Sequence, residues 1–274
     1  MPTTTAPAIP ALLDAPTEDR LAVAIGAIAR QAPDQVAIVA QAGSDARRSI
    51  DYPTLAQAIT RLEAALDAAR PVGIVARATR VESLVAIAAA CGRQHVPVAF
   101  LAEDSRDLVG ELRDWLEVDD SLTLPAAPAG GRTRLEFETV PPQVIVATSG
   151  TSGPPKLVDH SWDSLLAAAR LSEQWHGLGW LLVYDATRWA GIQVWLQALL
   201  TGGRLVVPAS RDPDVVARAL ADEAVSILPA TPTLLRRLLT SADHSLLARS
   251  ALERITLGGE AADSPLLEQA KGVF

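Results

Sequence analysis

Short apolar and β-branched runs alternate with segments of helical periodicity along most of this 274-residue chain. Such runs, bounded by Gly, Pro or polar residues, predict strands. In the run at 141–147, the four residues after Gln143 are all apolar, which is typical of a strand covered on both faces. Strands are predicted at residues 34–40, 71–76, 96–101, 141–147, 180–186, 204–208, 224–229 and 255–260.

Between these runs, apolar residues recur three and four positions apart, the spacing of one helix face. Gly92 is predicted to end one helix, and Ser161 is a good N-cap for another. Helices are predicted at residues 55–69, 81–90, 108–116, 162–175, 192–200, 215–220, 234–239 and from Ser264 onward. The alternation predicts an α/β fold of mostly parallel sheets flanked by helices, with right-handed crossovers.

Composition narrows the classes of partner. A net charge of −8 without a basic tract argues against nucleic acid and anionic membranes. No apolar run approaches the roughly 18 residues of a membrane span, and the first residues lack the pattern of a signal peptide. Residues 1–16 are predicted to be a flexible leader, and a cytoplasmic location is expected. Cys91, the only cysteine, is predicted to be a buried helical thiol.

The segment VATSGTSGPPKLVDHS, residues 146–161, is the strongest candidate for chemistry. It is not a Walker A loop, because two prolines precede Lys156 and Leu157 stands where Ser or Thr is required. It is not a nucleophile elbow, since neither serine has glycines at both required offsets. What remains is a strand–loop–helix in which backbone N–H groups, hydroxyls and one lysine could bind an anion. By composition alone, a polar connection with Lys156 in water is an equal alternative.

The order of residues favours the first alternative. Thr148 to Lys156 resembles the phosphate loop of the adenylate-forming superfamily, which includes acyl- and aryl-CoA ligases, luciferases and peptide-synthetase adenylation domains. Ser152 replaces the usual second threonine, Leu157 stands where many members have glycine, and His160 occupies a position where histidine is frequent. The resemblance implies catalytic roles for Lys156 and Thr151. It implies nucleotide binding by Thr148, Ser149, Gly150, Thr151, Ser152, Gly153 and Lys156.

A second segment, from Leu257, resembles the part of the same superfamily that lines the adenine pocket. By itself, a Gly-Gly turn after a strand is more often only a tight connection. The resemblance implies that backbone atoms lie against the base, at Gly258, Gly259, Glu260 and Ala261.

A third segment, residues 183–208, resembles the wall of the superfamily's acid pocket. Its spacing is similar to that of the aryl- and acyl-CoA ligases, notably the o-succinylbenzoate–CoA ligase type. Asp185 also resembles the aspartate with which peptide synthetases bind a substrate amine, so an amino acid remains an alternative to a non-amino acid. The implied pocket residues are Asp185, Arg188, Trp189 and Gly191.

The implied reaction is ATP-dependent activation of a carboxylic acid to an acyl- or aryl-adenylate, followed by transfer to a thiol of CoA or of phosphopantetheine on a carrier protein. No spacing of His, Cys, Asp or Glu is typical of a metal site, so Mg²⁺ is expected to arrive with ATP.

The resemblance implies two interleaved αβ subdomains of an adenylate-forming N-terminal domain, approximately 66–180 and 17–65 plus 181–274. Residues 17–274 are expected to be a truncated form of that domain without its C-terminal lid domain. A second polypeptide or a missing C-terminal half would then complete catalysis, and Lys271 does not take the place of the lid domain's lysine. The alternative is a non-catalytic nucleotide- or acyl-binding remnant, or a scaffold subunit.

Overall fold

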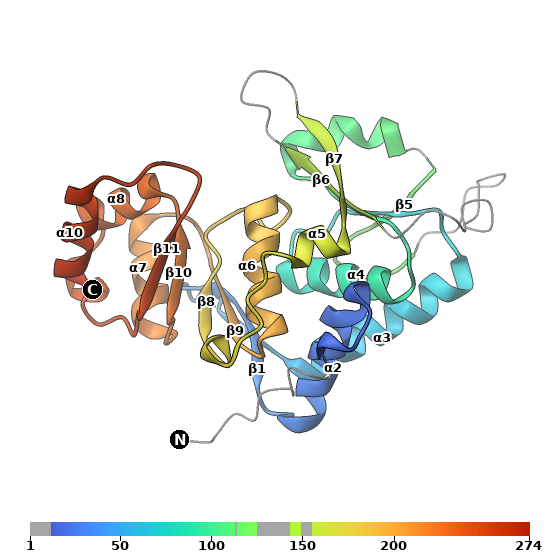
Figure 1. Cartoon of the computed structure of the whole chain (residues 1–274), viewed down its shortest axis with the longest axis horizontal. Helices are drawn as coiled ribbons and strands as arrows, with labels where there is room; N and C mark the ends of the chain where they lie inside the picture. Colours follow the sequence, from blue (N-terminus) through green and yellow to red (C-terminus); the bar gives the residue numbers. More distant parts are fainter. Residues whose placement is uncertain (1–11, 113, 125–142, 149–154) are drawn as a thin grey trace.

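The computed structural model describes residues 12–112, 114–124, 143–148 and 155–274. It confirms an α/β fold with two mostly parallel sheets flanked by helices (Figure 1). Within the described residues, the one antiparallel pairing in each sheet is made by an edge strand, β2 in one and β7 in the other.

The six-stranded sheet has the spatial order β11-β10-β8-β9-β1-β2. Its strands in that order are Arg254–Leu257, Ile227–Ala230, Gly179–Leu181, Arg204–Pro208, Val36–Ala42 and Arg48–Asp51. The five-stranded sheet has the order β5-β3-β4-β6-β7. Its strands are Leu116–Val118, Ile74–Ala76, Val98–Phe100, Gln143–Thr148 and Lys156–Ser161.

The α-helices connect these strands and cover their faces. They are α2 (Arg20–Gln31), α3 (Tyr52–Ala69), α4 (Val81–Arg93), α5 (Trp162–Leu166), α6 (Trp189–Leu200), α7 (Pro213–Asp222), α8 (Pro232–Ser241), α9 (His244–Leu247) and α10 (Ser264–Val273). The described residues also form the 3₁₀ helices η1 (Thr17–Asp19), η2 (Glu103–Leu112) and η4 (Glu173–Trp175).

The six-stranded sheet is assembled from two separate parts of the sequence. β1 pairs in parallel with β9, with Ile38 opposite Leu205. The buried Tyr52 hydroxyl donates a 2.7 Å hydrogen bond to the Gly203 carbonyl oxygen and joins the same two parts. The strands of the five-stranded sheet come from the intervening residues, 74–161. The subdomain boundaries near residues 66 and 180 stay a prediction.

Two helices are almost completely enclosed. Every residue of α4 from Ser83 to Gly92 is buried, including Cys91, which confirms the buried thiol. In α6, only Gln193 between Gly191 and Leu200 is not fully buried. Figure 1 shows α6 standing between the two sheets, with β8 and β9 on one side and β6 and β7 on the other.

The role predicted for Gly92 is wrong. α4 continues through Gly92 to Arg93, so this glycine does not end the helix. A Cβ atom at Gly92 would lie 2.2 Å from the carbonyl oxygen of Glu18, in η1. Gly92 therefore allows η1 to pack closely against α4. Of the predicted leader, residues 1–11 lie outside the described part, and Leu12 is buried.

Three predicted helices differ from those observed. Residues 103–112 form a 3₁₀ helix, and Leu116 begins strand β5. The helix after Ser161 has the predicted cap, since Ser161 Oγ accepts from the Ser164 N–H at 3.1 Å, but it ends at Leu166. Beyond the end of this helix, the backbone N–H of Arg170 donates a hydrogen bond to Gln197 Oε1, with an N to Oε1 distance of 2.6 Å. The last helix is capped by Asp263 rather than Ser264.

Among the described residues, no helix is both long and apolar enough to cross a lipid bilayer.

Candidate functional site

The candidate phosphate segment begins where β6 ends. The predicted strand and helix flank the segment, but the prediction missed strand β7 between them. Lys156 starts β7, which pairs antiparallel with β6 and places Thr148 opposite Lys156. The Thr148 hydroxyl lies 3.4 Å from the Lys156 carbonyl oxygen, and Lys156 itself is exposed. The N-terminus of helix α5 follows only after β7, with Ser161 as its N-cap. The predicted residues Ser149, Gly150, Thr151, Ser152 and Gly153 lie outside the described residues.

The candidate acid-pocket segment, residues 183–208, forms a turn at the start of α6. Asp185 Oδ1 accepts hydrogen bonds from the Thr187 N–H at 2.9 Å and the Thr187 hydroxyl at 2.7 Å. A Cβ atom at Gly191 would lie 1.9 Å from the Asp185 carbonyl oxygen, so only glycine lets this turn pack on α6. Gly191 therefore allows the turn at Asp185 and Ala186 to pack closely on α6.

This turn contacts the hairpin formed by β6 and β7. Arg188 Nη1 donates a 2.8 Å hydrogen bond to the Ala147 carbonyl oxygen on β6. The Trp189 ring lies against the His160 ring on β7, with 4.3 Å between the centroids. Burial lowers the pKa of His160, and the nearby Asp159 carboxylate offsets part of this effect. Two predicted pocket residues thus lie beside both strands that flank the candidate phosphate segment.

The candidate adenine-pocket segment, which begins at Leu257, follows β11. Gly258, Gly259, Glu260 and Ala261 are exposed, and Gly259 has a φ of +82°, which favours glycine. Glu260 Oε2 accepts a 2.6 Å hydrogen bond from the Thr233 hydroxyl at the start of α8. Burial, and then the charge of Glu260, raise the pKa of Tyr184. The Thr233 contact joins the turn after β11 to the start of α8.

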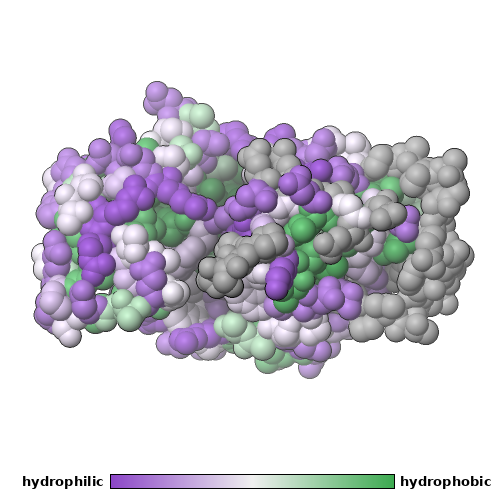
Figure 2. All heavy atoms as spheres, turned by 90° about the horizontal axis from the view of Figure 1, so that it is seen from above, coloured by the Kyte–Doolittle hydropathy of each residue, from purple (hydrophilic) through white to green (hydrophobic). Residues whose placement is uncertain are grey.

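A cavity of about 290 Å³ lies where strands of both sheets end. Its walls combine aliphatic side chains such as Leu84 and Leu101 with the polar residues Arg77, Asp185 and Thr187. Figure 2 views this side of the molecule from above and shows hydrophobic surface exposed between hydrophilic regions. Of the predicted pocket residues, Asp185 lines the cavity, whereas Arg188, Trp189 and Gly191 are not part of its wall.

Sequence reasoning missed the partners of Arg188. Its guanidinium also forms an ion pair with Asp104, a residue of η2. Asp104 belongs to an acidic stretch without a recognisable motif, and Ala147 acts only through its backbone. Neither carries a signal that could be read from one sequence. In the part of the chain that the structure describes, no group of three or more His, Cys, Asp or Glu residues could bind a metal ion.

Comparison with known proteins places these features in context. A family model described as AMP-binding enzyme matches residues 36–274. Syringomycin synthase SyrB1 of Pseudomonas syringae pv. syringae is 30% identical over 282 residues, which cover 87% of this chain and 43% of that protein. A 2-succinylbenzoate–CoA ligase of Bacillus licheniformis is 30% identical over 132 residues, 46% of this chain and 27% of the ligase. The chain thus spans less than half the length of these curated relatives.

Solved structures share the fold over nearly the whole chain. The inhibitor-bound N-terminal domain of FACL13 from Mycobacterium tuberculosis has a TM-score of 0.72 and 16% identity, covering 92% of this chain and 73% of that one. The o-succinylbenzoate coenzyme A synthetase MenE of Bacillus subtilis, in complex with AMP, has a TM-score of 0.64 and 20% identity, covering 91% and 70%.

Proposed function

Because the chain belongs to the AMP-binding enzyme family, we propose that it binds ATP with Mg²⁺ and takes part in activating a carboxylic acid as an acyl- or aryl-adenylate. One observation carries this proposal. Strands of both sheets end at one cavity lined by Asp185, and Arg188 joins the Asp185 turn to the β6 strand that leads into the Thr148 segment. The Gly258 segment follows β11, which lies parallel to β10 in the same sheet as β8.

Each segment has a role in the proposal. Lys156 supplies a compact positive charge at the loop end of the β6–β7 hairpin, and the Thr148 hydroxyl donates to phosphate oxygens. A Cβ atom at Gly258 would meet nothing within 4 Å, so the backbone there is open to a flat base. The other proposed nucleotide-binding residues are Ser149, Gly150, Thr151, Ser152, Gly153, Gly259, Glu260 and Ala261, with Thr151 and Lys156 acting on the reacting phosphates.

The chemistry is an in-line displacement, for which positioning and charge neutralisation matter most. When bound, ATP supplies the α-phosphoryl group that the acid's carboxylate oxygen takes, while pyrophosphate leaves and Mg²⁺ offsets charge on the phosphates. The chain's own residues hold the two reactants at one edge of the sheets. A thiol of CoA or of a carrier-protein phosphopantetheine is the proposed acceptor, with a second polypeptide or further domain completing the enzyme.

We assign the apolar part of the acid to the cavity. A volume of about 290 Å³ lies at the lower end of the range for small-molecule sites. Ala186 lines this cavity. An Ala186→Trp substitution should therefore fill it and weaken acid binding while leaving ATP binding unchanged.

An amino acid is the second candidate substrate, because the Asp185 carboxylate lines the same cavity. A substrate amine would pair with that carboxylate, whereas a non-amino acid would not need it. Asp185→Asn keeps an oxygen for Thr187 and removes the charge. It should abolish activity with amino acids and spare activity with non-amino acids.

The chain contains a matched pair of lysines for the decisive test. Lys156 starts β7, whereas Lys271 is exposed on α10 and pairs with Glu268 at 2.8 Å. ATP–Mg²⁺ binding is measured by calorimetry for the wild type, Lys156→Ala and Lys271→Ala. Loss of a charged hydrogen bond to phosphate, about 1.5–3 kcal/mol, predicts binding at least about tenfold weaker for Lys156→Ala only.

Pyrophosphate exchange with a panel of amino, aryl and aliphatic acids then separates catalysis from binding. Acid-dependent exchange supports the ligase function. ATP binding without exchange for any acid, both by this chain alone and with the completing polypeptide or domain added, supports the non-catalytic nucleotide-binding alternative. Absence of ATP binding by the folded wild type would overturn the nucleotide site itself.

A further inference from the structure

The first turn of α6 contacts both strands of the hairpin that carries the candidate phosphate segment. Ala147, the acceptor of the Arg188 hydrogen bond, directly precedes Thr148 on β6. His160, which lies against Trp189, is on β7. The two contacts come from neighbouring residues of one helix end, so α6 fixes the hairpin on both of its strands.

The Arg188 guanidinium is occupied on two sides. Nη1 bonds the Ala147 carbonyl oxygen, and Nη2 pairs with the Asp104 carboxylate. The Arg188 side chain is 20% exposed, whereas Asp104 is 63% exposed. A planar guanidinium can serve two acceptors at once, which a lysine ammonium on its flexible stem does poorly. Arg188 therefore links three segments: η2, the end of β6 and the start of α6.

The other end of this link is the turn that lines the cavity. The Arg188 N–H donates to the Asp185 carbonyl oxygen at 3.1 Å, and Thr187 is held by Asp185 Oδ1. Since Gly191 allows that turn to pack directly on α6, the turn cannot shift without moving Arg188. A displacement of the Asp185 turn is thus transmitted through the Arg188 side chain to Ala147, the residue before Thr148.

We propose that Arg188 is a positioning residue that sets the hairpin relative to the cavity and so aligns the ATP phosphates with the acid. This inference rests on the proposed function. Arg188 acts here through Ala147 and Asp104, rather than by binding the charge of the acid. The two roles of Arg188, positioning the hairpin and binding the acid's charge, predict opposite results for Asp104→Ala. Removing this carboxylate breaks the link between η2 and Arg188 but leaves the arginine charge in place.

The first measurement does not depend on any ligand. Hydrogen–deuterium exchange is followed in β6 and β7 for the wild type, Arg188→Ala, Arg188→Lys, Asp104→Ala and the control Arg249→Ala. Arg249 forms an exposed ion pair with Asp222 that is distant in the fold from the hairpin. Loss of one charged hydrogen bond predicts about tenfold faster exchange in the Arg188→Ala hairpin, a smaller increase for Asp104→Ala and no change for the control.

The second measurement is the ATP–Mg²⁺ dissociation constant and, for active protein, the split between KM for the acid and kcat in pyrophosphate exchange. Positioning predicts that Arg188→Ala and Asp104→Ala both weaken ATP binding or lower kcat, and that lysine does not rescue. Recognition of the acid's charge predicts a raised KM for the acid, rescue by lysine and no effect of Asp104→Ala, and this result would overturn the inference.

Exchange in β6 and β7 that is unchanged in Arg188→Ala would also overturn it, whatever the activity. Failure of the wild type to bind ATP would refute the proposed function alone, since the exchange result still decides whether Arg188 holds the hairpin.

Discussion

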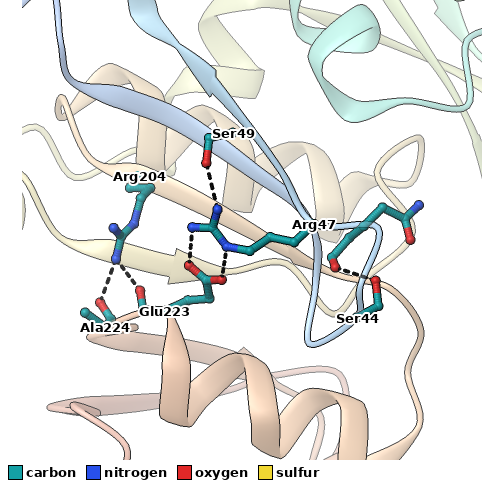
Figure 3. A network of polar contacts seen from close by, with 7 residues as sticks. Ser44, Arg47, Ser49, Arg204, Glu223 and Ala224 are labelled. Carbon is teal, nitrogen blue, oxygen red and sulfur yellow. Dashed lines mark hydrogen bonds and ion pairs between the residues drawn. The ribbon is translucent and has the colours of Figure 1, made fainter.

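Arg47 clamps the carboxylate of Glu223 with two nitrogens, Nε at 2.5 Å and Nη2 at 3.0 Å from its two oxygens (Figure 3). Glu223 is only 6% exposed, whereas Arg47 is 46% exposed. Arg204 donates to the backbone carbonyl oxygens of Glu223 and Ala224 beside the same carboxylate. The network joins the β1–β2 connection to the end of α7 and the start of β9.

Glu223→Gln should lower the free energy of unfolding by about 1–2 kcal/mol, because the two charge-assisted bonds are lost while Arg47 can still reach water. The matched control is Asp222→Asn, the preceding residue, whose ion pair with Arg249 is exposed and 3.4 Å long. It should change stability by less than about 0.5 kcal/mol. Urea denaturation measures the unfolding free energy of both variants. Equal losses would show that the Arg47–Glu223 pair stabilises the protein no more than the exposed Asp222–Arg249 pair does.

Gly92→Ala should destabilise the protein, although alanine is the better helix former. Its Cβ would lie 2.2 Å from the Glu18 carbonyl oxygen, and the overpacking should cost about 1–3 kcal/mol. Gly272, on α10, has nothing within 4 Å of the same position. Gly272→Ala should therefore stabilise by up to about 1 kcal/mol. Thermal unfolding of the two variants in opposite directions checks this prediction.

Cys91 should not react with thiol reagents in the folded state. Burial raises the pKa of its thiol well above the ordinary value, and the side chain is inaccessible. A disulfide reagent at pH 8 should modify the protein only after denaturant is added. Rapid stoichiometric reaction in native buffer would mean that α4 opens readily.

Stability should rise with pH through the range in which histidines titrate. Burial lowers the pKa of His160, so the unfolded chain binds more protons than the folded one near and below pH 6.5. His160→Gln should flatten the dependence of unfolding free energy on pH between 7.5 and 5.5. Asp159→Asn should steepen it, because the Asp159 charge partly restores the His160 pKa. An unchanged slope in both variants would contradict the assignment.

Continuous apolar strands and long amphipathic helices could be predicted from the sequence, because the spacing of their own apolar residues indicates which positions are buried. β7 could not, because its hydrogen bonds come from β6, and its Pro-Lys start resembles a loop. β5 is three residues long and shows no periodicity. α2 carries a readable face of Leu21, Ile25 and Ile28, all buried, and was still missed.

The sequence names Thr148, Lys156 and Asp185 as candidate site residues through their resemblance to the motifs of the superfamily, and their binding roles stay predictions. The link through Arg188 was not predictable, since it depends on a backbone carbonyl of Ala147 and on Asp104, which are brought close only by the packing of the two sheets.

The interleaved order of the sheets has a consequence for synthesis on the ribosome. All strands of the five-stranded sheet have been translated once residue 161 is added, so this sheet can form before the later strands of the other sheet are made. β1 is made first but must wait for β9, because Ile38 pairs with Leu205. During that interval β1 can pair with β2, but the edge that later pairs with β9 has no partner strand. A nascent chain stalled between the two should therefore be the form most in need of a chaperone.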